Sequence, residues 1–191
     1  MEVLKQLILL VLIIAVGLGV YFGALLPLGK AQSFINAQTN LSTVQNTDDL
    51  KKLYDVPLTM WSPVGQEEAV KFTAGTLSDI LMGQNIDEQT ARWLVEYIEP
   101  HLFKNDLRHL LLLGDMYRVI WERYGGNPQD FIKAEEYYLK ANAIGPKIPP
   151  ILYRLTDMYL KTGNKDEARK HAETILKYWD DENVRQVMSQ L

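Results

Sequence analysis

Two glycines, an asparagine and a proline interrupt the chain at Arg123-Tyr124-Gly125-Gly126-Asn127-Pro128, and a glycine-rich stretch of this kind can cradle a phosphate group. A phosphate loop needs Gly-x-x-x-x-Gly-Lys-Ser/Thr between a strand and a helix, and neither the strand pattern nor the Lys-Ser/Thr is present here. The stretch instead predicts a helix end with Gly125 in the left-handed conformation, followed by a new helix that Asn127 caps.

Other residue types that carry chemistry lack the spacing that catalysis or metal binding needs. Neighbouring carboxylates such as Glu135-Glu136 point to different sides of a helix, so they cannot act together on one substrate. No serine lies in a nucleophile-elbow context, and the chain has no cysteine. The histidines show no His-Glu-x-x-His or similar ligand spacing, and we expect them at the surface or at helix ends: His101, His109 and His171. We therefore predict a protein that is not an enzyme, with no cofactor and no metal.

The charge balance excludes one class of partner. The chain carries 24 acidic and 20 Lys and Arg side chains, with the two signs interspersed. Nucleic-acid binding needs a basic stripe, so we predict no nucleic-acid partner.

The N-terminal residues 1–29 form a predicted transmembrane anchor. Residues 7–28 carry no charged side chain, and roughly 22 apolar residues in a helix cover the ~30 Å hydrocarbon core of a bilayer. The apolar region of a cleaved signal peptide is shorter, and no small-x-small cleavage site follows, which favours an uncleaved single-pass anchor. Gly19 and Gly23 match the small-xxx-small pattern of close helix packing, which indicates a route to a homodimer through the membrane helix. Weak charge flanks, with Lys5 before the run and Lys30 after it, favour an extracytoplasmic body.

Beyond the anchor we predict a connector over residues 30–61 and an all-α domain over residues 62–191. A short amphipathic helix within the connector should stop at Val56-Pro57, because proline removes a helix donor. Capping signals at Asn85, Asn127 and Asn164 mark three helix starts. Expected helices cover residues 64–82, 86–99, 105–124, 128–144, 149–162, 165–178 and 181–190.

The last two predicted helix pairs contain an internal repeat of small and large residues. The first pair carries Leu110, Leu113, Gly114, Tyr117, Ala134, Tyr138, Ala141 and Pro146. The second pair carries Leu152, Leu155, Tyr159, Gly163, Ala168 and Leu176 at the spacing of a unit of about 34 residues. Gly114 and Ala134 let two helices of a hairpin approach closely, Ala141 offers a flat surface to the next hairpin, and Tyr117 and Tyr138 fill the space around these contacts.

This pattern resembles the tetratricopeptide repeat, over roughly residues 107–180. The resemblance implies an α-solenoid, here of about three hairpins if residues 66–99 form a divergent pair. The second unit departs from the pattern, with Thr156 for the glycine, Ala172 for the aromatic residue and Asp181 for the proline, as is typical of a terminal unit. The first unit is longer by about one helical turn on each helix, which displaces its corner outward.

The resemblance also implies where a partner would bind. In the repeat family the first helices line a concave groove, and the matching positions are Arg108, Leu111, Asp115, Arg118, Val119, Tyr153, Asp157 and Lys161. A groove of mixed charge with a tyrosine suits a protein or peptide partner. The protruding hairpin tip, with Trp121, Arg123 and Tyr124, is a second candidate contact site.

Three segments, Tyr21–Leu28, Ser62–Glu68 and Tyr117–Pro146, also look like the C-terminal tail of O-antigen ligase or polymerase-like membrane proteins of bacteria. That resemblance implies a location in the bacterial envelope. Two functions follow as expectations: a membrane-anchored interaction or assembly scaffold, or an accessory subunit or detached tail of a glycan-handling membrane enzyme.

Overall fold

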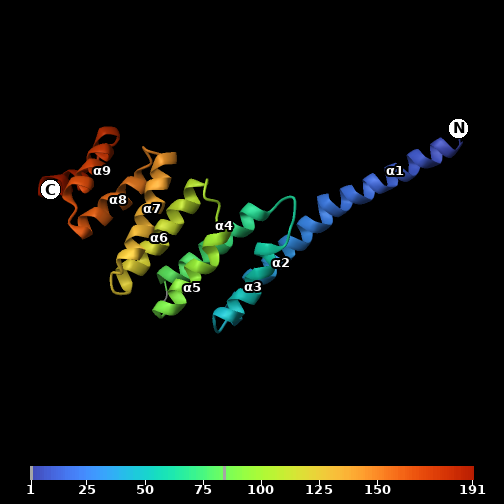
Figure 1. Ribbon diagram of the computed structural model, residues 1–191, viewed down its shortest axis with the longest axis horizontal. Helices are drawn as coiled ribbons and strands as arrows, with labels where there is room; N and C mark the ends of the chain where they lie inside the picture. Colours follow the sequence, from blue (N-terminus) through green and yellow to red (C-terminus); the bar gives the residue numbers. More distant parts are fainter. Residues whose placement is uncertain (1, 84) are drawn as a thin grey trace. The chain divides into compact units, whose positions relative to one another are not determined.

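The computed structural model of the chain describes residues 2–83 and 85–191, and within these ranges the protein is helical without any strand (Figure 1). The prediction of an all-α fold is confirmed. Met1, the first residue of the predicted anchor, lies outside the described residues. The chain divides into two compact units, residues 1–76 and residues 77–191, which are described separately below.

Unit 1 begins with one continuous helix. It is made of α1 (Glu2–Val20), a π-helical turn (Tyr21–Leu25) and α2 (Leu26–Asn40), and it ends in a 3₁₀ turn at Leu41–Thr43 (Figure 1). The helix is long and apolar enough to cross a membrane, and none of the side chains in its most apolar window is buried. Side chains exposed around the whole circumference are what a helix in contact with lipid requires.

The π-helical turn has a local cause in Pro27. Proline has no backbone N–H, and its ring clashes with the carbonyl group four residues earlier, so a regular α-helical turn cannot form before it. The helix widens instead, and the backbone N–H of Leu26 donates to the carbonyl oxygen of Tyr21, five residues back. The helix therefore passes Pro27 without breaking.

The segment predicted as a connector is itself largely helical. α3 (Thr47–Thr59) follows α2 and packs against it, and the side chain of Asn46 caps its start by accepting from the backbone N–H of Asp49 at 2.9 Å. The prediction that this helix stops at Val56-Pro57 is wrong, because Pro57 lies inside α3. Pro57 is buried, so its packing offsets the hydrogen bond that its missing N–H cannot make.

Most helix boundaries agree with the sequence-based prediction to within two residues. Those of α7, α8 and α9 agree at both ends. The helix after α3 is α4, which spans Gln66–Gly83. The later helices are α5 (Glu88–Ile98), α6 (Leu107–Arg123), α7 (Pro128–Ile144), α8 (Pro149–Thr162), α9 (Lys165–Tyr178) and α10 (Glu182–Gln190), with a 3₁₀ turn at Glu99–His101.

Two of the three predicted caps are confirmed. The side chain of Asn127 accepts from the backbone N–H of Gln129 at 3.0 Å, and that of Asn164 accepts from Glu167 at 3.3 Å. The prediction for Asn85 is wrong: α5 is capped two residues later by Asp87, whose carboxylate accepts from the backbone N–H of Thr90 at 2.9 Å. A carboxylate at this position also interacts favourably with the positive end of the helix dipole.

Unit 2 contains two antiparallel hairpins, α6–α7 and α8–α9, which Figure 1 shows side by side with α10 after them. Gly125 and Gly126, at φ 83° and 68°, make the left-handed corner predicted between α6 and α7, and Gly163 does the same between α8 and α9. α10 closes the end of the array, where Val184 joins Leu152, Ala172 and Ile175 in one apolar cluster.

Gly114 sets the spacing between α6 and α7. A Cβ atom added at Gly114 would lie 2.5 Å from two ring carbons of Tyr138, a distance that atoms in contact do not reach. The Tyr138 ring is completely buried, and its hydroxyl group donates to Asp115 at 2.6 Å, so the ring cannot move away. Only glycine at position 114 allows this approach of the two helices.

We therefore predict that Gly114→Ala lowers the free energy of unfolding by about 1–3 kcal/mol, the usual cost of overpacking a filled core. Gly83→Ala is the matched control, because an added Cβ there meets no atom within 4 Å. It should change stability by less than about 0.5 kcal/mol. Unfolding of the full chain in detergent, followed by far-UV circular dichroism, measures both. Equal stability of the two variants would contradict this account of the hairpin.

Candidate functional site

Four of the eight predicted groove residues, namely Asp115, Arg118, Asp157 and Lys161, lie in a row of ion pairs between α6 and α8. Three pairs of opposite charge join the helices, each separated by 39 residues: Asp115 with Arg154, Arg118 with Asp157, and Glu122 with Lys161. The relevant distances are 2.5, 3.3 and 2.8 Å. A constant separation means that α6 and α8 run parallel in one fixed register. We call these six residues the charge ladder.

Additional ion pairs close the outer part of the ladder. Within α6, Arg118 lies 3.0 Å from Glu122, and within α8, Lys161 lies 3.0 Å from Asp157. Burial by itself lowers the pKa of Lys161, but the carboxylates of Glu122 and Asp157 outweigh this effect and raise it. Each charge at this end has an opposite charge on its own helix and on the other, so the predicted groove positions here are engaged within the protein.

Asp115 lies beneath the surface rather than on it. Its side chain accepts from the Tyr138 hydroxyl at 2.6 Å and pairs with the Arg154 guanidinium at 2.5 and 3.2 Å. Only 9% of the residue is exposed. Burial and the neighbouring carboxylate of Asp115 raise the pKa of Tyr138, which keeps its hydroxyl protonated as a donor. One carboxylate thus connects α6, α7 and α8.

The other predicted groove residues have varied surroundings. Arg108 is exposed and pairs at 2.7 Å with Asp106, the residue that caps α6. Val119 is buried, and Leu111 is half-buried. The Tyr153 hydroxyl donates to Asp181, the capping residue of α10, so it connects α8 to the start of the last helix.

Two of the three predicted tip residues bind backbone carbonyl groups of neighbouring segments. The Arg123 guanidinium donates to the carbonyl oxygens of Leu81, at 2.6 Å, and of Met82. The Tyr124 hydroxyl donates to the carbonyl oxygen of Ile86 at 2.7 Å. These bonds tie the end of α6 to the α4–α5 connection.

Trp121, the third tip residue, packs edge-on against Phe131 with ring centroids 5.4 Å apart. Its indole also lines a surface hollow, together with Glu122, Gly125, Gly126 and Lys161. Trp121 therefore lies at a concave surface.

A second polar cluster, which the sequence analysis missed, surrounds Glu99. Its carboxylate accepts from the hydroxyl groups of Tyr117 and Tyr137, and the Lys104 and Lys133 ammonium groups lie 3.6 and 3.9 Å away. Burial alone would raise the pKa of Glu99, but the two tyrosine hydroxyls and the two lysines together lower it. Tyr117, expected as simple packing, therefore also holds a carboxylate that follows α5.

Arg92 and Asp130 form a further link that the sequence analysis missed. Both terminal nitrogens of the Arg92 guanidinium on α5 donate hydrogen bonds to the Asp130 carboxylate on α7, each at 2.8 Å. The hydrogen bonds that Arg92 donates to the Asp130 carboxylate raise the pKa of Arg92, and partial burial opposes this effect. Arg92 and Asp130 are 38 residues apart, and the pairs of the charge ladder are 39 residues apart. Opposite charges at this recurring separation are a signal in the sequence that could have indicated both.

Two of the three histidines are buried. His109 lies in the first turn of α6, which agrees with the expected helix-end position, whereas His171 is buried in the middle of α9, which corrects the expectation for that residue. The Nδ1 atom of His109 accepts from the backbone N–H of Phe103 at 3.1 Å, and its ring stacks on the Phe103 ring. The ring of His171 stacks on that of Tyr159, with centroids 5.7 Å apart and planes 5° from parallel. Among residues 2–83 and 85–191, no group of three His, Asp or Glu side chains is arranged to hold a metal ion.

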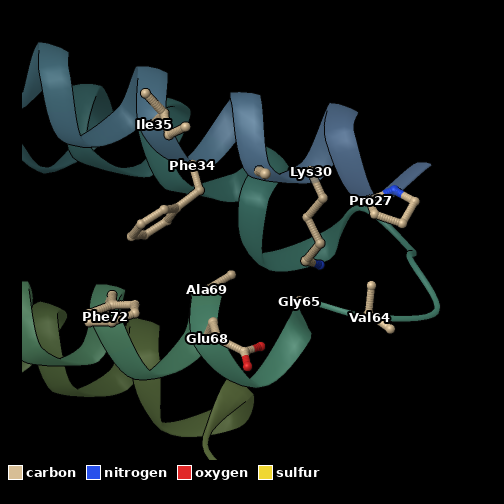
Figure 2. A pocket seen from close by; sticks show the side chains of 10 residues that line it. Pro27, Lys30, Phe34, Ile35, Val64, Gly65, Glu68, Ala69 and Phe72 are labelled. Carbon is tan, nitrogen blue, oxygen red and sulfur yellow. The ribbon is translucent and has the colours of Figure 1, made fainter. Parts of the chain in front are cut away.

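Unit 1 contains an apolar hollow of about 400 Å³ between α2 and the first part of α4 (Figure 2). Pro27 and Val64 lie at one end, and Phe34 and Phe72 lie toward the other, with ring centroids 6.0 Å apart. The Lys30 side chain is buried next to the hollow, and its ammonium group donates to the Met60 carbonyl oxygen at 2.6 Å and to the Gln66 side-chain oxygen. These bonds satisfy a charge that is costly to bury.

The repeat-packing residues lie where the hairpins meet. Ala134, Tyr138, Ala141, Tyr159 and Ala168 are buried, whereas Pro146 is exposed.

No family model, curated protein or solved structure matches this chain.

We predict that Asp115→Ala lowers the free energy of unfolding by about 3–5 kcal/mol, because it leaves the Tyr138 hydroxyl and the Arg154 guanidinium without their carboxylate. Glu136→Ala is the control: its carboxylate lies 2.6 Å from Lys140, and both side chains are about half exposed. That loss should cost less than about 1 kcal/mol. Chemical unfolding in detergent distinguishes the two variants, and similar losses would show that Asp115 is no more than a surface charge.

Stability should also depend on pH through His171. Burial, with a smaller effect from Lys170, lowers the pKa of His171 below its ordinary value of 6.5, against the opposing effect of Glu167. The unfolded chain then binds a proton that the folded chain resists. The contribution of neutral His171 to the free energy of unfolding is therefore fully present above about pH 7. It is lost as the pH falls below 6.5, by up to about 1.4 kcal/mol per pH unit.

His171→Phe should reduce this slope, because it keeps a ring on Tyr159 and removes the titrating group. The measurement is the unfolding midpoint of both proteins at a series of pH values between 7.5 and 5.5. An unchanged slope in the variant would assign the pH dependence to other groups.

Proposed function

We propose that this protein is a membrane-anchored helical hairpin array of the tetratricopeptide kind, which serves as a non-catalytic protein-interaction or assembly module. The observation that carries the proposal is the fixed parallel register of α6 and α8, with three ion pairs at one separation of 39 residues. Stacked hairpins whose first helices run parallel form one continuous surface, and repeat proteins use such surfaces to bind partners.

The anchor in this proposal is the apolar run over residues 7–28. Its support is the continuous helix, whose large apolar side chains from Leu7 to Leu25 are all exposed, from 41% at Phe22 to 66% at Val16. Gly19 and Gly23 border open space, since an added Cβ at either would meet no atom within 4 Å. A second copy of the helix could approach closely there, so we propose this stripe as the route to a homodimer. We also propose that the body lies outside the cytoplasm.

The proposed partner surface is the face of α6 and α8 that carries the charge ladder. Because the charges of the ladder neutralise one another, a partner with one strong charge would gain little binding energy from them. The contact energy should come from Leu111, Tyr153 and the exposed Arg108, with the ladder setting the orientation of a peptide of mixed charge. Aromatic and arginine side chains are the ones that most often dominate such contacts.

Photo-crosslinking in intact cells tests this proposal without removing any structural charge. A benzoylphenylalanine placed at Leu111, on α6, should give a discrete adduct with one protein. The same group at Ile132, which is 48% exposed on α7, is the matched control and should give none. Identical adducts from both positions, or none from Leu111, would contradict the assigned face. An adduct with a many-span glycosyl-transferring protein would favour the alternative role as an accessory subunit of a glycan-handling enzyme.

A further inference from the structure

We propose that the α3–α4 loop, Met60–Gly65, is a second membrane contact, inserted into the lipid interface beside the anchor. The inference rests on the proposed function only in taking residues 7–28 as the membrane span. The loop sequence Met-Trp-Ser-Pro-Val-Gly carries no charge. Its two large side chains point outward, since Trp61 is 63% and Val64 is 60% exposed. Exposed apolar side chains that continue a larger apolar patch mark a surface for contact with a membrane or another protein.

The depth of the loop follows from one ring contact. The Trp61 indole packs edge-on against the Phe22 ring, with centroids 5.8 Å apart. Phe22 lies six positions before Leu28, so at about 1.5 Å per residue it is about 9 Å inside the end of the apolar run. If the run fills the hydrocarbon core, the Trp61 ring lies in the outer part of that core, next to the interfacial layer. Tryptophan prefers the interfacial layer, where its apolar ring meets lipid and its N–H meets polar groups.

The loop is held against the helix by contacts that do not depend on lipid. The ammonium group of Lys30 donates to the Met60 carbonyl oxygen at 2.6 Å and to the Gln66 side chain, and Gln66 in turn donates to the Leu58 carbonyl oxygen at 2.9 Å. The end of the Met60 side chain sits so close to Gly29 that an added Cβ would lie 3.1 Å from it. These bonds fix both ends of the loop, so its position is set before any membrane contact.

The surface around the loop is continuous with the apolar helix. Val64 and Pro27 lie at the same end of the apolar hollow, as Figure 2 shows. The neighbouring helix residues are also exposed and uncharged: Tyr21, Phe22, Leu25 and Leu28. Together with Trp61 and Val64 they form one apolar patch at the end of the anchor. Because this patch is continuous with the proposed membrane span, we expect lipid to cover it. The contact lies at the boundary between headgroups and acyl chains.

The chain has no cysteine, so a single labelled cysteine can report the depth of the loop. Val64→Cys carries an NBD fluorophore, and the full protein is reconstituted in phosphatidylcholine vesicles. Ile13→Cys, in the span, and Ile132→Cys, on α7, are matched controls with similarly exposed side chains, 60% and 48%. We expect doxyl groups near the headgroup to quench the Val64 label at least about twofold more than the Ile132 label, and iodide in the water to quench it correspondingly less.

Three results would overturn the inference. A Val64 label as accessible to iodide as the Ile132 label, with the Ile13 label quenched by lipid, would mean that the anchor is correct but the loop is in water. A Val64 label protected from iodide yet not quenched by lipid would mean that protein covers the loop. An Ile13 label that lipid does not quench would remove the membrane span itself, and with it both proposals.

Discussion

The carboxylate of Asp115 is the interaction on which the arrangement of α6, α7 and α8 depends. It accepts from Tyr138 on α7 and pairs with Arg154 on α8, so a single buried group sets both the hairpin and its contact with the next one. The close approach at Gly114 depends on the same Tyr138 ring. A small helical array has few buried polar groups, and a fully bonded one favours a single register over sliding alternatives.

The same register determines which charges the surface of α6 and α8 presents. Arg118, Glu122, Asp157 and Lys161 each have a partner within the protein, so they keep the two helices in place instead of presenting one sign of charge. If this surface binds a partner, as we propose, it should discriminate by shape and by apolar contact more than by net charge. The surface is held in place by ion pairs that span the two helices that form it.

Unit 1 joins a helix that is long and apolar enough to cross a membrane to a packed part of the protein. The π-helical turn before Pro27 lets the helix continue, and the buried Lys30 is satisfied by oxygen atoms from the loop and from the start of α4. The hydrogen bonds of this ammonium group thereby hold the Met60–Gly65 loop in place. These bonds place the indole of Trp61 against Phe22, within the apolar run.

Local rules in the sequence determined the helices and their ends: apolar periodicity, the caps at Asn127 and Asn164, and the glycine corners were all predictable, because each depends on a few neighbouring residues. Pro57 inside α3, the cap at Asp87 and the burial of His109 and His171 were not, because packing from distant segments decided them. The roles of the groove residues likewise came from the tertiary structure. Sequence shows that Asp115 and Arg118 are charged residues of one predicted helix and that Asp157 is a charged residue of another, but only the parallel register of α6 and α8 brings each of them to its opposite charge.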